Sequence, residues 1–320
     1  MQQHHRLWNA MSEIRRTDFF NLQKQILETL FLPEWFVHTT RKDHPAYLRW
    51  SLCRKILDQQ GAIRWPEQRA DLPTLARIGL DSWILAAITE GDLRRLKLGS
   101  LDFHGDQSVQ KKVRSRVEDP EQYEDLMVEL YVGAWHLTEN HSVAYLEKEG
   151  VPDFRIDIRD ADFPVLIDCK RLRQRSAKRA RKDVTKANTQ IKNARTNVDP
   201  AYGILVLDAS AGDFTKAQGD QLPDGLGPII KAVQSSLSGQ ENRSVGAVVL
   251  VWDDYMVRGI PPDKTWVGFR RRYERVFHKN PLTPVPKDLR MFDGWTVEFT
   301  LHWTPRGQTD TLDRMKWIPG

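Results

Sequence analysis

Two acidic residues and a lysine lie close together in the segment VPDFRIDIRDADFPVLIDCKRL, residues 151–172. Asp153 follows a proline, and Asp168 and Lys170 flank Cys169. Carboxylates of this kind can bind Mg²⁺, which prefers oxygen ligands and usually takes one or two carboxylates. A nearby ammonium group can orient an attacking water or stabilise charge that develops on a phosphate. The alternative interpretation is an ordinary hairpin whose outward face is charged.

Strand geometry predicts that these side chains converge. Residues 154–159 and 165–172 have strand-like patterns, and side chains on a strand alternate between the two faces of the sheet. Asp168 and Lys170 then share one face. If residues 159–164 form the turn, Asp153 falls across from Asp168 or Lys170, and cross-strand Cβ atoms are roughly 5 Å apart. Asp157 shares the strand face of Asp153 and is an alternative ligand, although we expect it to be solvated.

The flanking sequence predicts the elements that position this patch. DPEQYEDLMVELYVGAWHL has Asp119 as an N-cap and Pro120 at the first helical position, and it carries Glu129 at the edge of an apolar stripe. Further helices are predicted at 176–197 and 226–238, and strands at 141–149, 203–210 and 245–252. The order α-β-β-β-α-β-α-β predicts an α/β fold with a mixed sheet and helices on both sides. Additional strands are expected at 273–278 and 295–303.

The predicted helix at 176–197 and the residues before it are strongly basic. Between Lys170 and Arg195 there are eleven Lys or Arg and one acid, Asp183, although the whole chain carries a net charge of only +5. Such a concentration predicts a polyanionic partner, because neutralising phosphates releases counterions; a solvated helix face is the alternative. The expected nucleic-acid contacts are Arg171, Arg173, Arg175, Lys178, Arg179, Arg181, Lys182 and Lys186.

This pattern resembles the PD-(D/E)XK nuclease superfamily, which has the restriction-endonuclease-like fold. The resemblance covers about residues 119–255 and rests on Pro152-Asp153 and Asp168-Cys169-Lys170. It implies an αβββαβ core. It also implies that Asp153, Asp168 and the main-chain carbonyl of Cys169 bind the metal, and that Lys170 is the catalytic lysine.

Two helical residues complete the resemblance. Glu129 resembles the acid of the first core helix, which adds a metal ligand directly or through water. Gln190 resembles the glutamine that follows the lysine strand in several branches. The tyrosine that often accompanies this glutamine four residues later is replaced by Ala194, which argues against the branch of helicase-associated exonucleases.

We therefore expect a helical N-terminal domain at 1–112 and a nuclease-like domain at 113–320 that ends in a strand extension. The predicted activity is Mg²⁺-dependent hydrolysis of phosphodiester bonds, with Mn²⁺ as an alternative metal. By the resemblance, DNA is favoured over RNA, and defence of bacteria against foreign DNA is a family-level expectation. A non-catalytic nucleic-acid-binding protein and a protein-interaction subunit on the same scaffold are the alternatives.

Composition limits the other function classes. An apolar fraction of 40% predicts a real core, and two cysteines exclude a disulfide scaffold or a cysteine-rich zinc site. No apolar run is long enough to cross a bilayer, so we expect a cytoplasmic protein without a membrane partner. A protein partner or a homo-oligomer remains open. His136 and His141 are predicted to be structural, and the segment 269–279 is either a nucleic-acid contact or a solvated strand.

Overall fold

The computed structural model describes most of the predicted core and parts of the N-terminal region. The described residues are 20–21, 23–24, 27–28, 31, 33–38, 40–58, 74, 77–78, 115–138, 141–146, 149–158, 161–210, 215–216, 222–260, 264–285, 297–306 and 309–319. The expected domain boundary near residue 112 lies outside them. So do large parts of the helical N-terminal domain expected at 1–112.

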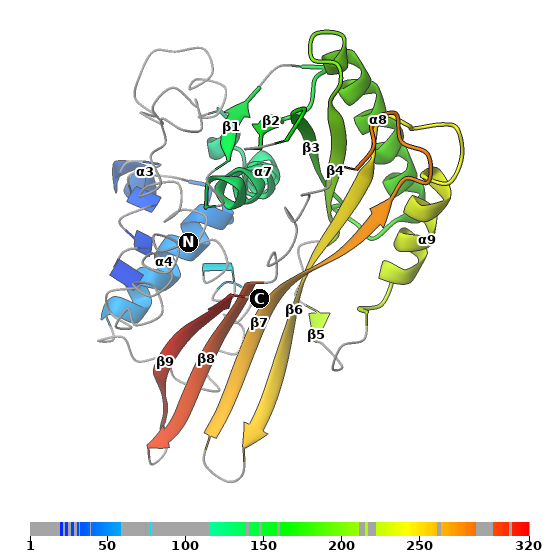
Figure 1. Cartoon of the computed structure of the whole chain (residues 1–320). Helices are drawn as coiled ribbons and strands as arrows, with labels where there is room; N and C mark the ends of the chain where they lie inside the picture. The colour runs from blue at the N-terminus through cyan, green and yellow to red at the C-terminus, as the bar shows by residue number, and fades with distance from the viewer. Residues whose placement is uncertain are drawn as a thin grey trace.

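A single mixed sheet forms the centre of the fold (Figure 1). Its order is β1-β2-β3-β4-β6-β7-β8-β9, with the short β5 paired to β6. The β3–β4, β4–β6 and β5–β6 pairs are parallel, and the remaining pairs are antiparallel. The strands are β1 (Ser142–Tyr145), β2 (Phe154–Asp157), β3 (Val165–Arg171), β4 (Tyr202–Asp208), β5 (Thr215–Lys216), β6 (Ala247–Ile260), β7 (Lys264–Phe277), β8 (Val297–Arg306) and β9 (Thr309–Pro319).

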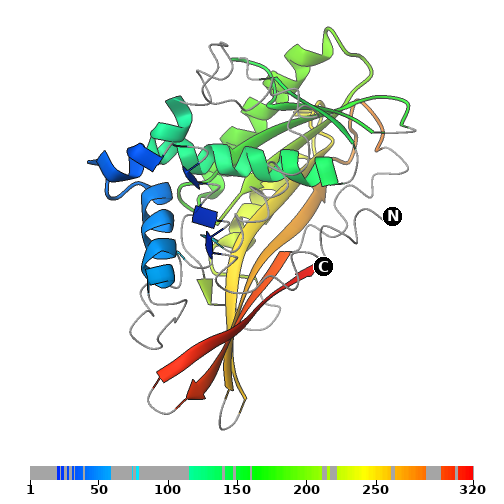
Figure 2. The ribbon, with the colours of Figure 1, turned by 90° about the vertical axis from the view of Figure 1, so that its left-hand side faces the viewer.

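Helices cover both faces of the sheet, as Figures 1 and 2 show. α8 (Ala177–Arg195) and α9 (Leu226–Ser236) pack together on one face, and α7 (Pro120–Thr138) crosses the other. α3 (Pro33–His38) and α4 (Pro45–Asp58) lie beside α7. The α/β class and the predicted order of core elements are confirmed, and among the described helices none is long and apolar enough to cross a membrane.

Burial explains why the central strands have continuous apolar sequences. Every residue of β4 is buried, which is expected for a strand covered by helices on both faces. The stripe of Ala and β-branched residues on α8 lets that helix lie close to the sheet. Its buried members are Ala180, Val184, Ala187, Ile191 and Ala194.

Polar contacts tie the described N-terminal residues to this core. The Nη2 of Arg49 on α4 donates to Oε1 of Glu124 on α7 at 2.7 Å, and Nη1 donates to the hydroxyl of Tyr123 at 3.1 Å. Arg77 forms an ion pair of 2.6 Å with the buried Asp253 of β6. The N-terminal helical part and the sheet therefore share buried charged groups.

The basic part of the 269–279 segment lies in β7 and is largely committed to intramolecular ion pairs. Arg271 is buried and donates from Nε and Nη2 to the carboxylate of Asp253, at 2.8 and 3.0 Å. Arg270 and Arg272 both contact Asp254. These three arginines hold the β6–β7 pair together, so the expectation of a nucleic-acid contact has no support from their placement.

Close packing at Gly203 gives a test of the parallel core. A Cβ at this position of β4 would lie 2.1 Å from the carbonyl oxygen of Ser244 and 2.8 Å from a methyl group of Ile191. We expect Gly203→Ala to lower the free energy of unfolding by about 1–3 kcal/mol, because the backbone of a central sheet has little room to move. Gly227→Ala is the control, since nothing lies within 4 Å of its Cβ position. Denaturant unfolding followed by circular dichroism measures both, and equal stabilities would contradict this packing.

Candidate active site

The predicted acidic pair meets where β2 separates from β3. The last pair between these strands is Phe154 with Ile167, so Asp153 lies just beyond it, next to Asp168. Oδ2 of Asp153 accepts a hydrogen bond of 2.6 Å from the main-chain N–H of Cys169. The backbone carbonyl of Asp153 accepts another from the N–H of Leu146, after β1. Both ends of Asp153 are thereby fixed against neighbouring backbone.

Asp168 and Lys170 form a close ion pair on one face of β3. The Nζ of Lys170 donates to Oδ1 of Asp168 at 2.7 Å. Asp168 is fully buried, and its Oδ2 has no hydrogen-bond partner among the described residues. A charged outward face would be solvated, so burial of Asp168 rules out the ordinary-hairpin interpretation for this residue. By contrast, Asp157 is 46% exposed and pairs with Arg155, which places it outside the cluster.

Glu129 on α7 supplies a third carboxylate whose oxygens are already engaged. Arg116 donates to both oxygens, at 2.8 and 2.5 Å, and the hydroxyl of Tyr145 donates to Oε2 at 2.6 Å. In this arrangement Glu129 has protein donors on both oxygens, and it affects Asp153 and Asp168 through its charge. Direct or water-mediated metal binding by Glu129 would require it to share those oxygens.

The ionisation properties show a shortage of positive charge in the cluster. Burial, Glu129 and Asp168 raise the pKa of Asp153 well above its ordinary value. Burial also raises the pKa of Asp168 to about 6, although Lys170 opposes the shift. For Lys170, burial disfavours the ammonium, but the carboxylates of Asp168 and Asp153 outweigh it and raise its pKa. The lysine is therefore a cation here, and the carboxylates still lack neutralising charge.

One face of α8 forms the opposite wall of the cluster. Asp183, Lys186 and Gln190 are spaced by three and four residues, which places them on the same side of the helix. Oδ2 of the buried Asp183 accepts from Nε of Arg179 at 3.0 Å, and its Oδ1 has no partner among the described residues. Burial raises the pKa of Asp183, whereas the charges of Arg179, Lys170 and Lys186 lower it. The carboxylate of Asp183 is thus a counter-charge for the ammonium groups of Lys170 and Lys186.

Gln190 contacts the loop that carries Asp153. Its Nε2 donates to the carbonyl oxygen of Val151 at 2.9 Å, and its buried Oε1 has no partner in the described part of the chain. The glutamine therefore positions the acidic loop through its amide donor, and its acceptor remains available. Cys169 is buried, and burial raises the pKa of its thiol, so it fits a packing role better than a nucleophilic one.

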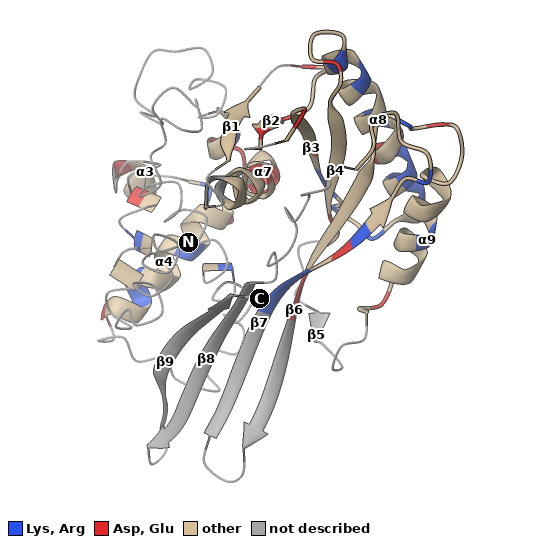
Figure 3. Ribbon diagram, in the orientation of Figure 1, with Lys and Arg blue, Asp and Glu red and all other residues tan. Residues whose placement is uncertain are grey.

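The predicted nucleic-acid contacts divide into two groups. Arg173 pairs with Glu121 at 2.5 Å, and Arg175 donates to the carbonyl oxygens of Ala209 and Asp224, so these arginines tie loops and helices together. Arg171 reaches Asp125 at 3.6 Å. Exposed basic residues remain along α8, where Figure 3 marks Lys and Arg positions in blue. They are Lys178, Arg179, Arg181, Lys182 and Lys186, of which Arg179 pairs with Asp183.

The sequence interpretation missed Arg116, Tyr145 and the role of Asp183. Asp183 could have been found from its helical spacing to Lys186 and Gln190. Arg116 and Tyr145 belong to segments outside the recognised motif, and only the packing of α7 against β1 brings them to Glu129. His136 and His141 contact each other through Nδ1 atoms at 3.1 Å, and burial lowers the pKa of His136 to about 3, which fits a structural pair.

The donor set fits a hard divalent cation. No group of three or more His, Cys, Asp or Glu side chains suited to a metal occurs among the residues that the structure describes. Mg²⁺ requires fewer, because it usually takes one or two carboxylates and keeps water or phosphate oxygens as its other ligands. The free Oδ2 of Asp168, the carboxylate of Asp153 and the carbonyl of Cys169, which leaves the strand on the same edge as its N–H, supply such donors.

Removing one charge from this cluster should stabilise the metal-free protein. Folding raises the pKa of Asp153. The stabilisation that comes from the protonated carboxyl is therefore fully present below the unfolded-state pKa of about 4, and it is lost as the pH rises through the folded-state pKa. We expect Asp153→Asn to exceed the wild type in free energy of unfolding by on the order of 1–2 kcal/mol near about pH 8, and by little near about pH 4.5.

Urea unfolding in the presence of a chelator measures this difference. Asp157→Asn is the matched control, because Asp157 is half exposed and should change stability by less than about 0.5 kcal/mol at either pH. A wild type that is the more stable protein at the higher pH would show that the cluster is not strained by excess negative charge.

Comparison with protein-family models, curated proteins and solved structures found no significant match to this chain. The geometry of the buried carboxylate–lysine cluster is therefore the basis on which a function can be argued.

Proposed function

We propose that this protein is a metal-dependent nuclease that hydrolyses phosphodiester bonds of DNA. The observation that carries the proposal is the fully buried Asp168, whose Oδ2 has no partner among the described residues, next to the partly buried Asp153 and the Lys170 ammonium. The pKa values of both carboxyls are raised, and such carboxylates are costly to ionise unless a cation neutralises them. The resemblance to PD-(D/E)XK nucleases supports the same interpretation, since the αβββαβ order of elements is present.

Asp153, Asp168 and the carbonyl of Cys169 are the groups that would hold Mg²⁺ or Mn²⁺. The metal would make its bound water more acidic and stabilise charge on the attacked phosphate. Lys170 stays protonated against Asp168, so its role is to hold that carboxylate in place and to donate to a phosphate oxygen as charge develops there.

Other residues of this chain position those groups. Gln190 and the N–H of Cys169 fix the loop and carboxylate of Asp153. Asp183 is a counter-charge for Lys170 and Lys186, whose charges lower its pKa. The exposed bases of α8 lie on the same helix as Asp183 and Gln190, so DNA phosphates bound by these bases would lie near the acidic pair. Contacts of this type give affinity with little base specificity.

A nucleic-acid-binding protein without catalysis is the second candidate. The observation in its favour is the engagement of both Glu129 oxygens by Arg116 and Tyr145, which leaves two acidic side chains for a metal. Such a protein would bind DNA through α8 and would not cleave it with Mg²⁺ or Mn²⁺.

Cleavage assays on plasmid, linear and single-stranded DNA distinguish these candidates. We expect Mg²⁺- or Mn²⁺-dependent cleavage by the wild type and a loss of about 100-fold or more in Asp168→Ala and Lys170→Ala, because each removes a group that acts on the reacting phosphate. Asp157→Ala should cleave at the wild-type rate, since its side chain lies outside the cluster. Equal cleavage by the wild type and both cluster variants would contradict this active site.

The salt dependence of DNA binding tests the α8 surface. Replacing Lys178, Arg181 and Lys182 with Gln should lower the slope of log K against log salt by roughly 0.9 for each duplex phosphate contact that is lost. The charge-matched control replaces three exposed bases of α4 and α9: Arg54, Lys55 and Lys231. Fluorescence anisotropy in a chelator, at several salt concentrations, gives both slopes. Equal slopes for the two triple variants would place the DNA elsewhere.

A further inference from the structure

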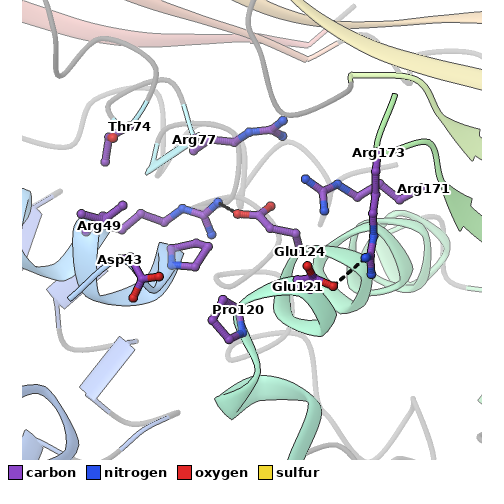
Figure 4. A pocket seen from close by; sticks show the side chains of 11 residues that line it. Asp43, Arg49, Thr74, Arg77, Pro120, Glu121, Glu124, Arg171 and Arg173 are labelled. Carbon is purple, nitrogen blue, oxygen red and sulfur yellow. Dashed lines mark hydrogen bonds and ion pairs between the residues drawn. The ribbon is translucent and has the colours of Figure 1, made fainter. Parts of the chain in front are cut away.

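A cavity separate from the acidic cluster lies between α4, Thr74 and Arg77, the start of α7 and the end of β3 (Figure 4). Its volume is about 470 Å³, which is within the usual size of a small-molecule site. Four arginines contribute to the lining: Arg49, Arg77, Arg171 and Arg173. The cavity therefore joins the N-terminal helical part to the element that carries Lys170.

The cavity lining contains four arginines and three acids, Asp43, Glu121 and Glu124. Glu124 is paired with Arg49 at 2.7 Å. Burial opposes ionisation of Glu124, yet the charges of four guanidinium groups, those of Arg49, Arg77, Arg171 and Arg271, outweigh it and lower the pKa of the carboxyl. One carboxylate thus faces several arginines, and an anion in the cavity would be stabilised by the same groups.

Arg171 has one long ion pair among the described residues. Its side chain is only 13% exposed, and among the described residues it reaches Asp125 at 3.6 Å and makes no closer polar contact. A guanidinium has several N–H donors in a planar fork, so a long contact with one carboxylate leaves donors that a bound anion could use. Figure 4 shows Arg171 and Arg77 extending toward the same space beside Glu124. That fork matches the oxygens of a phosphate group.

The other residues that line the cavity could bind ligand groups other than a phosphate. Asp43 and Glu121 provide carboxylate acceptors for N–H groups, and Leu48, Pro45 and Pro120 provide apolar surface for a flat ring. A nucleotide combines these properties: a phosphate for the arginines, amino or imino donors for the acids and a base that packs against Leu48. We propose that this cavity binds a nucleoside phosphate, either free or as part of a DNA strand.

The cavity and the candidate active site share two structural elements, β3 and α7. Arg171 follows Lys170 on β3, and Glu121 and Glu124 lie on α7, the helix that carries Glu129. The binding site goes beyond the proposed nuclease activity and does not depend on it, because binding is measurable in a chelator where metal-dependent cleavage is absent.

Isothermal titration calorimetry of the full chain in EDTA tests the proposal. The probes are the 5′-mononucleotides of the four bases, the corresponding nucleosides, inorganic phosphate and a short single-stranded DNA. The cavity variants are Leu48→Glu and Arg173→Glu. Their controls are Val37→Glu, another exposed apolar residue, and Arg54→Glu, whose side chain is 59% exposed against 56% for Arg173.

We expect at least one mononucleotide to bind, and its nucleoside and phosphate to bind about tenfold more weakly or not at all. Both cavity variants should weaken that binding by about tenfold, and both controls should stay within about twofold of the wild type. Loss of single-stranded DNA binding in the cavity variants alone, without binding of mononucleotides, would support a strand-linked nucleotide as the occupant.

The proposal is overturned if neither mononucleotides nor DNA bind, or if the cavity variants and the controls bind every probe equally. Failure of the nuclease proposal is a different result, since a protein that never cleaves DNA can still bind nucleotides and lose that binding in Leu48→Glu.

Discussion

A carboxylate held away from water with too little positive charge around it is the constraint on which the site depends. Asp168 is fully buried, and only its Oδ1 contacts Lys170. The backbone of Asp168 cannot move to bring the carboxylate into water, because β3 is paired in parallel to β4 along its whole length, including Asp168 with Leu205. Asp153 adds a second, partly buried carboxylate that is tied to the backbone of Cys169. The fold thus holds two carboxylates in place, although their mutual repulsion destabilises the metal-free state.

The surrounding elements maintain this arrangement by different means. β1 and β2 are short, so the β3 segment that carries Asp168 and Lys170 has the Asp153 loop as its neighbour on that edge. α8 covers one side with Gln190 and Asp183, and α7 covers the other with Glu129. The apolar stripe of α8 keeps that helix close to the sheet, which brings its polar face within reach of the cluster.

Strand alternation and element order were predictable because they depend on local periodicity. The apolar runs, the N-cap at Asp119 and the small-residue stripe of α8 all reflect secondary structure and burial of single elements, and the structure contains each of them. The convergence of Asp153 on Asp168 followed from the same alternation. Full burial of Asp168 could not be predicted from strand alternation, because it depends on helices that pack from distant parts of the chain.

Long-range partners account for what the sequence could not provide. Arg116 reaches Glu129, and Arg77 reaches Asp253, across separations that no short motif records. Arg173 and Arg175 are predicted phosphate contacts, and in the structure they bind acidic side chains or backbone carbonyls of neighbouring elements. Charge patterning identifies a basic segment, whereas packing shows which of its members also make contacts within the fold, as the 56% exposed Arg173 does.

Direct measurement of Mn²⁺ and Mg²⁺ binding by calorimetry, in the absence of nucleic acid, tests the central claim that the carboxylate cluster is a cation site. We expect the wild-type protein to bind the metal with release of protons near neutral pH, because the pKa of Asp168 is raised to about 6. Asp168→Asn should lose about tenfold or more in affinity. Equal metal affinity in the two proteins would contradict the claim.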